Sequence, residues 1–167
     1  MKRIRIIILL TIVLTSCVNS KKENQNIPLS ENKPTKSEFK KIQTNNSLEL
    51  EYQILDENDQ QIEFSRLEKI AEYPGGFDSL EVFIQRNFEF PEETKNMDIV
   101  GTVETTFNVS KIGEVVEIEI KKGLRKEIDQ ACIEIISKLP NWKPAELRDG
   151  EKVKMKFLLP LKFVIEE

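Results

Sequence analysis

Apolar residues recur along the second half of the chain with two periods, one typical of helices and one typical of strands. Helical spacing occupies residues 77–88, directly after the chain-breaking Pro74-Gly75-Gly76, and returns at residues 128–139. Strict alternation predicts strands at residues 102–109, 116–121 and 152–165. The order helix, hairpin, helix, strand predicts an α+β domain in two layers, in which helices cover one face of a three-stranded antiparallel sheet.

The residues before the first helix show weaker patterns. Residues 48–54 alternate apolar and polar, residues 56–59 are typical of a turn, and Ile62 and Phe64 fit the start of a return strand. We therefore interpret residues 48–71 as an extra hairpin or a lead-in to the domain. The domain itself is expected to span residues 72–167.

The N-terminus carries the pattern of a processing segment. Three basic residues precede an apolar run of nine residues, 6–14, which is far shorter than the ~20 residues that a membrane-spanning helix needs. The sequence Leu14-Thr15-Ser16-Cys17 follows. It resembles the lipobox of bacterial lipoproteins, where a peptidase cuts before the cysteine and the cysteine becomes lipidated. We therefore expect a signal peptide over residues 1–16 and lipidation at Cys17.

The residues after Cys17 resemble a tether. Only five of the 30 residues at positions 18–47 are apolar, too few to offset the entropy of an ordered backbone, so a flexible tether is expected over residues 17–47. The lipobox resemblance implies an envelope protein that is held to a membrane by lipid without spanning it. Val18 stands where the inner-membrane retention signal places Asp, which favours the outer membrane, with the domain facing the periplasm.

Composition excludes several functions. The 167 residues include no histidine and only two cysteines, so the chain lacks the Ser–His–Asp and Cys–His triads and any Cys-rich zinc site. A net charge of -4 disfavours nucleic acid as a partner. We expect no catalytic residues, no metal and no cofactor. Cys132 falls on the apolar stripe of a helix and Trp142 lies just beyond it, so both are expected to be buried in the core.

Seven short motifs follow one another over residues 70–167. They are Tyr73-Pro74-Gly75-Gly76, Phe90-Pro91, Ile99-Val100-Gly101, Lys111-Ile112-Gly113, Ile128-Asp129-Gln130-Ala131, Leu139-Pro140-Asn141-Trp142-Lys143-Pro144 and Leu159-Pro160-Leu161-Lys162-Phe163. In this order they resemble the TonB C-terminal domain, in the form common among Bacteroidetes-like envelope proteins. Thr94 and Ala145 depart from the family pattern, which usually has Ala and Gly there. Family energy transducers also carry a membrane-spanning helix where this chain has a lipobox.

The resemblance implies a non-enzymatic periplasmic domain. Such domains pair their last strand with a short segment of an outer-membrane transporter, and the aromatic-proline step, here Phe90-Pro91, lies near that contact. Pro160 supports a similar edge, because a proline within a strand is tolerated where its missing N–H faces no neighbour. Even-numbered residues of the last strand then face an open side. The candidate partner-binding residues are therefore Lys152, Lys154, Lys156, Leu158, Phe90 and Pro91, and the lysines also suit protection of an open edge.

Two functions fit these observations. The first is an envelope lipoprotein whose domain binds an outer-membrane transporter or another envelope protein by β-strand addition, as in TonB-type transport across the outer membrane. The second is a structural envelope adaptor or a homodimer that uses the same edge strand without energy transduction. An enzyme is disfavoured because the catalytic constellations are missing.

Overall fold

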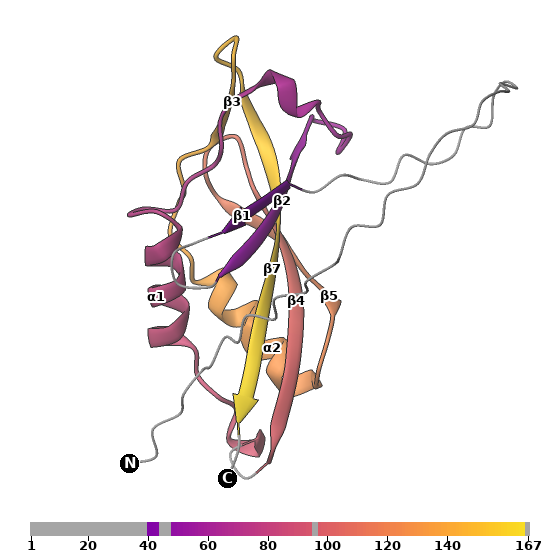
Figure 1. Ribbon diagram of the computed structural model, residues 1–167, viewed down its shortest axis with the longest axis vertical. Helices are drawn as coiled ribbons and strands as arrows, with labels where there is room; N and C mark the ends of the chain where they lie inside the picture. Colours follow the sequence, from indigo (N-terminus) through magenta and orange to yellow (C-terminus); the bar gives the residue numbers. More distant parts are fainter. Residues whose placement is uncertain (1–39, 44–47, 95–96, 166–167) are drawn as a thin grey trace, which may run out of the picture.

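A curved antiparallel sheet and two α-helices make up the computed structural model, which describes residues 40–43, 48–94 and 97–165 (Figure 1). The helices are α1 (Phe77–Asn87) and α2 (Lys126–Ser137), and two short 3-10 helices are η1 (Phe64–Arg66) and η2 (Glu92–Thr94). The strands are β1 (Lys40–Gln43), β2 (Glu49–Leu55), β3 (Leu67–Lys69), β4 (Ile99–Val109), β5 (Val115–Lys122), β6 (Ala145–Leu147) and β7 (Lys152–Ile165).

The sheet is wider than the sequence predicted. Its main path runs β1-β2-β7-β4-β5, and β6 pairs with both β3 and β7. The α+β class and the antiparallel pairing are confirmed, but the expectation of three strands is wrong. The strand β7 is 14 residues long and lies at the centre of the sheet, so it offers both of its sides for pairing.

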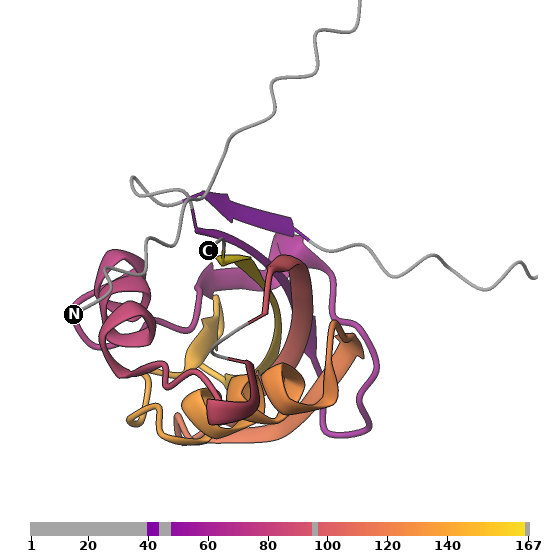
Figure 2. The same ribbon diagram turned by 90° about the horizontal axis from the view of Figure 1, so that it is seen from below.

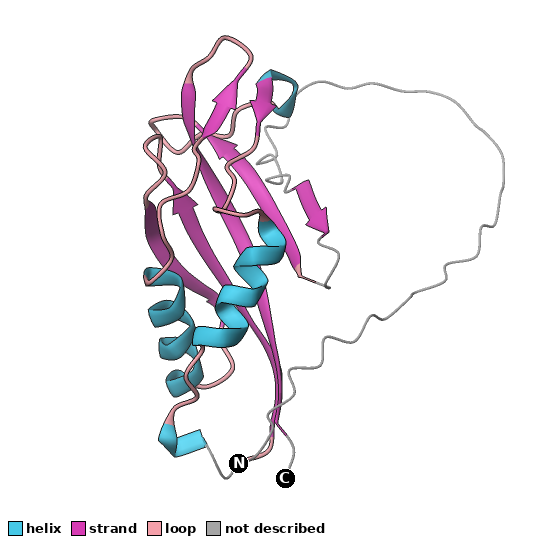
Figure 3. Cartoon of the chain, turned by 90° about the vertical axis from the view of Figure 1, so that its left-hand side faces the viewer, coloured by secondary structure: helices cyan, strands magenta, loops and turns pink. Residues whose placement is uncertain are grey.

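Both helices begin and end close to where periodicity placed them. The helix α1 follows Gly75 and Gly76, whose positive φ angles of 84° and 82° let the chain turn into the helix. It buries Leu80 and Ile84, and α2 buries Ile128, Ala131, Cys132, Ile135 and Ile136. All of these side chains except that of Ala131 join Phe107 and Phe157 in one core cluster. Figures 2 and 3 show both helices against the concave face of the sheet.

The segment before α1 forms more of the sheet than expected. Residues 40–43, assigned to the tether, form β1 and pair with β2. The strand β2 and its turn match the expected hairpin, since the Asp56 carboxylate accepts hydrogen bonds from the N–H groups of Asn58 and Gln60. The prediction of a return strand at Ile62 and Phe64 is wrong. Only an isolated bridge between Leu55 and Gln61 forms there, and Phe64 begins η1.

The outer face of the sheet is less solvated than simple alternation predicts. Gln53 and Asn108 both pair with Lys156 across the sheet and are only 6% and 2% exposed. They are buried because β2 widens the sheet and places them in its interior. In β5, Glu117 takes a positive φ of 53° at an irregularity in the register, which turns Val116 to the face of Asn108.

The N-terminal predictions fall outside the described residues. The signal peptide, Cys17 and most of the tether lie within positions 1–39, so lipidation stays a prediction. Among the helices that the structure describes, none combines the length and the apolar character that crossing a membrane requires.

Candidate protein-binding site

The two sides of β7 are paired to different extents. On one side β4 pairs with it continuously from Met155 to Ile165 and without a shift in register. On the other side β2 pairs only from Lys154 to Leu158. Within the described part of the chain, no strand therefore pairs with residues 160–165 on the β2 side. Figure 1 shows this stretch as the lower part of β7, beyond the end of β2.

The hydrogen-bonding direction of this stretch follows from β2. The Ile62 N–H donates to the Ile54 carbonyl at 2.9 Å, on the side of β2 that faces away from β7. Alternation then directs the backbone of Leu55 and Gln53 toward β7, and the even-numbered residues of β7 toward β2. The backbone groups of Lys162 and Val164 consequently point to the unpaired side. The even-numbered residues of β7 thus face away from β4, as Pro160 indicated.

The predicted location of the open ladder is wrong. Lys154, Lys156 and Leu158 are paired with Leu55, Gln53 and Glu51, and Lys152 is paired with Glu146 of β6. The physical reason is the apolar face of β2, where Leu50 and Ile54 are fully buried in the core. Burying these side chains brings β2 beside β7, so the chain covers this edge itself. The lysines of this stretch likewise do not protect an open edge.

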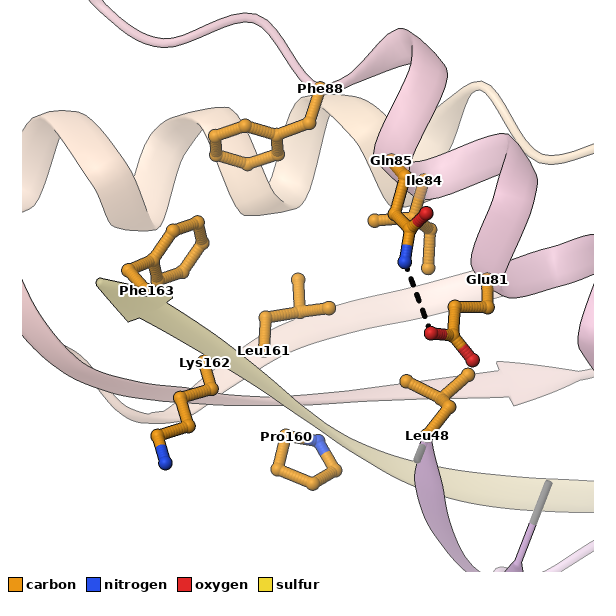
Figure 4. Close-up of a pocket in the computed structure, with 9 residues that line it drawn as sticks. All are labelled: Leu48, Glu81, Ile84, Gln85, Phe88, Pro160, Leu161, Lys162 and Phe163. Atoms are coloured by element: carbon orange, nitrogen blue, oxygen red, sulfur yellow. Dashed lines mark hydrogen bonds between the residues drawn. The ribbon is translucent and has the colours of Figure 1, made fainter. Parts of the chain in front are cut away.

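A small pocket lies beside the unpaired end of β7 (Figure 4). It opens between α1 and β7, and it is lined by Leu48, Glu81, Ile84, Gln85, Phe88, Pro160, Leu161, Lys162 and Phe163. Most of the lining is apolar. At one end Gln85 Nε2 donates to Glu81 Oε1 at 3.0 Å, and Glu81 is only 4% exposed. The backbone groups of Lys162 and Val164, which face no described strand, therefore lie beside an apolar pocket.

The predicted Phe90-Pro91 step lies next to this pocket. The Phe90 ring contacts those of Phe88 and Phe163, with centroids 5.0 and 6.0 Å apart. The Pro91 carbonyl accepts a hydrogen bond from the Thr94 hydroxyl at 2.7 Å, which fixes the start of η2. Phe88 itself lines the pocket and lies 5.2 Å from Phe163. The apolar pattern placed Phe88 only on the stripe of α1 and carries no signal for its position in the pocket lining at the helix end.

The lysines of β7 differ in their partners. Lys152 pairs with Glu146, and together with Lys69 it lowers the pKa of that carboxyl. Lys154 pairs with Asp59, and this hydrogen bond raises the pKa of the ammonium. Lys162 forms no ion pair with any residue of the described ranges, and it lines the pocket. The positive charge of Lys162 is therefore available to a partner at the unpaired end of the strand.

Comparison with known proteins identifies the domain. The family model of the Gram-negative bacterial TonB protein C-terminal domain matches residues 86–165. No curated protein and no solved structure matches the chain. The match includes β4, β5, α2, β6 and β7, whereas β1, β2, β3 and nearly all of α1 precede it. Residues 86–165 therefore match the TonB C-terminal domain family, whose members are non-enzymatic protein-interaction domains of the cell envelope.

Proposed function

We propose that this chain is an envelope lipoprotein that binds a partner protein by β-strand addition to residues 160–165 of β7. The observation that carries the proposal is the end of β7, where Lys162 and Val164 turn their backbone groups to a side that no described strand occupies. A strand placed there gains main-chain hydrogen bonds and lies against the apolar pocket. The family match supports protein binding as the activity of this region.

The proposed partner is an outer-membrane transporter or another envelope protein. The domain contributes recognition and no catalysis. The lipobox resemblance supports attachment through Cys17, and Val18 supports the outer membrane, with the domain in the periplasm. Replacing Cys17 with Ala should abolish fatty-acid labelling and release the protein from the membrane fraction. Labelling that persists in this variant would exclude Cys17 as the anchor.

Site-specific cross-linking tests the binding edge in cells. A photoreactive residue at Lys162 should cross-link to an envelope protein, whereas the same residue at Lys156, which lies beside Gln53 of β2, should not. Val164→Pro removes an N–H that serves no described strand, so it should abolish the cross-link and keep the fold. Val164→Ala is the matched control and should retain it. A cross-link from Lys162 that survives Val164→Pro would contradict strand addition at this edge.

A further inference from the structure

We propose that the pocket beside β7 selects partners with a small apolar side chain, Ala or Val, and that Phe88 sets this limit. This inference rests on the proposed function and specifies which segment fits there. Neighbouring strands place the side chains of facing residues on the same side of a sheet. The partner residue opposite Phe163 therefore points, as Phe163 does, to the face that the helices cover.

The size of the pocket limits what this residue can be. The cavity has a volume of about 40 Å³, several times smaller than the ~150 Å³ of an engineered cavity that holds benzene. A methyl or isopropyl group fits such a space, whereas a phenyl or indole ring does not. Val also suits the extended backbone of an added strand. Because the lining is mostly apolar, a charged group would lose its hydration there without compensation.

Phe88 is placed to set this size limit. It follows the last residue of α1, and its ring, drawn in Figure 4 among the lining residues, lies 5.2 Å from that of Phe163. Phe90 packs against the same two rings but does not line the pocket. Removing the Phe88 ring enlarges the pocket, and removing the Phe90 ring takes away only support from outside it. The two residues therefore form a matched pair for an experiment.

The charge at this edge favours a different protein over a second copy of the chain. Two copies paired antiparallel about Lys162 would place two ammonium groups directly opposite each other, which is destabilising. Lys162 has no ion-pair partner among the described residues, so a carboxylate on the partner next to the small residue would be attracted to it. The occupant is therefore an extended segment of another protein, with a small apolar residue flanked by an acidic one.

Peptide selection tests this directly. The full-length protein in detergent is presented with phage-displayed random peptides of about eight residues. We expect the wild type to enrich peptides with Ala or Val at one position, and replacing that residue with Phe should weaken binding about 10-fold or more. Phe88→Ala should reverse this preference toward Leu or Phe. Phe90→Ala, the matched control, should keep it. Circular dichroism and Trp142 fluorescence check that each variant is folded, and Phe88→Leu replaces Phe88→Ala if the latter unfolds.

Several outcomes overturn the inference. These are the absence of any enriched peptide, a consensus without a size preference, and an unchanged preference in the Phe88 variants. A concentration-dependent dimer lost in Val164→Pro would mean that a second copy occupies the edge. Selection that succeeds only after deletion of residues 18–39 would mean that the chain's own upstream segment does. If the residue at Lys162 still cross-links to a different envelope protein in the first three cases, the proposed function stands and only the size limit fails.

Discussion

Gly113 and Gly150 both adopt a positive φ, at 89° and 87°, but only Gly113 is pressed against another part of the chain. A Cβ atom at Gly113 would overlap the carbonyl oxygen of Trp142, whereas one at Gly150 meets nothing within 4 Å. We expect Gly150→Ala to lower the free energy of unfolding by ~1 kcal/mol, the cost of the left-handed conformation. Gly113→Ala should lower it by more than about 3 kcal/mol.

Urea unfolding of both variants measures this difference. The difference between the two losses reports the contact between the β4–β5 turn and the loop that holds Trp142, because the strain of the positive φ angle is common to both sites. The backbone N–H of Trp142 donates to the Gly113 carbonyl at 2.7 Å, so Gly113→Ala also disturbs this hydrogen bond. Equal losses in the two variants would show that the turn moves freely away from Trp142.

Burial of single residues followed from the sequence where periodicity governs it. Trp142 is 3% exposed and packs against the rings of Tyr73, Phe107 and Phe157, as a lone Trp between a helix and a strand suggested. Cys132 is fully buried on α2. Glu117 was not foreseen, because a positive φ in a residue other than Gly leaves no signal in the apolar pattern. Its side chain accepts a hydrogen bond from Asn108, on the face where Lys154 also approaches it.

Among the elements, β2 decides which part of β7 is left without a described partner strand. The apolar alternation of residues 48–54 predicted a strand, and Pro160 correctly indicated which residues of β7 face away from β4. The sequence did not reveal that β2 pairs with the even-numbered side of β7. Strand pairing over about a hundred residues is set by tertiary packing and not by local pattern. The predicted open ladder therefore lies on a stretch of β7 that β2 covers, and Phe88 was missed as part of the lining of the neighbouring pocket.

Amide hydrogen exchange should distinguish the two parts of this side. The N–H groups of Lys154, Lys156 and Leu158 face β2, so we expect them to exchange as slowly as the core amides. Those of Lys162 and Val164 face no described strand and should exchange much faster, while that of Phe163, which faces β4, stays protected. Fast exchange of the Lys154, Lys156 and Leu158 amides would mean that β2 leaves the edge readily and that the longer ladder is accessible after all.

At the scale of the whole molecule, the family domain is enlarged by upstream elements. β1 and β2 widen the sheet on the side away from β4, and α1 packs beside the end of β7. All of β1 and β2 and nearly all of α1 precede the residues that match the family. Together these elements shorten the open edge to residues 160–165 and provide Leu48, Ile84 and Gln85 to its pocket. The residues upstream of the match therefore supply four of the nine that line the pocket, and β2 limits the stretch of β7 that no described strand pairs with.

The buried titratable groups make the whole fold sensitive to alkali. Burial, together with the Asp129 carboxylate, raises the pKa of Cys132 from 9.0 to about 12, and burial also raises the pKa of Tyr52 and Tyr73. In each case the folded chain holds its proton at a pH where the unfolded chain releases it, so the free energy of unfolding must fall as pH rises. For Cys132 the contribution is fully present below about pH 9 and is lost toward pH 12. Three pKa units correspond to at most about 4 kcal/mol.

Urea unfolding of the wild type and of Cys132→Ala at about pH 8 and about pH 11 separates this contribution from the others. Cys132→Ala leaves a small cavity and should be less stable than the wild type at the lower pH. Its loss of stability between the two pH values should nevertheless be smaller, because it lacks the thiol that ionises on unfolding. Both proteins still lose some stability at alkaline pH, because the pKa values of Tyr52, Tyr73 and Lys154 are raised in each of them. Identical losses in the two proteins would show that Cys132 ionises as easily in the folded chain as in the unfolded one, and would contradict its burial beneath the sheet.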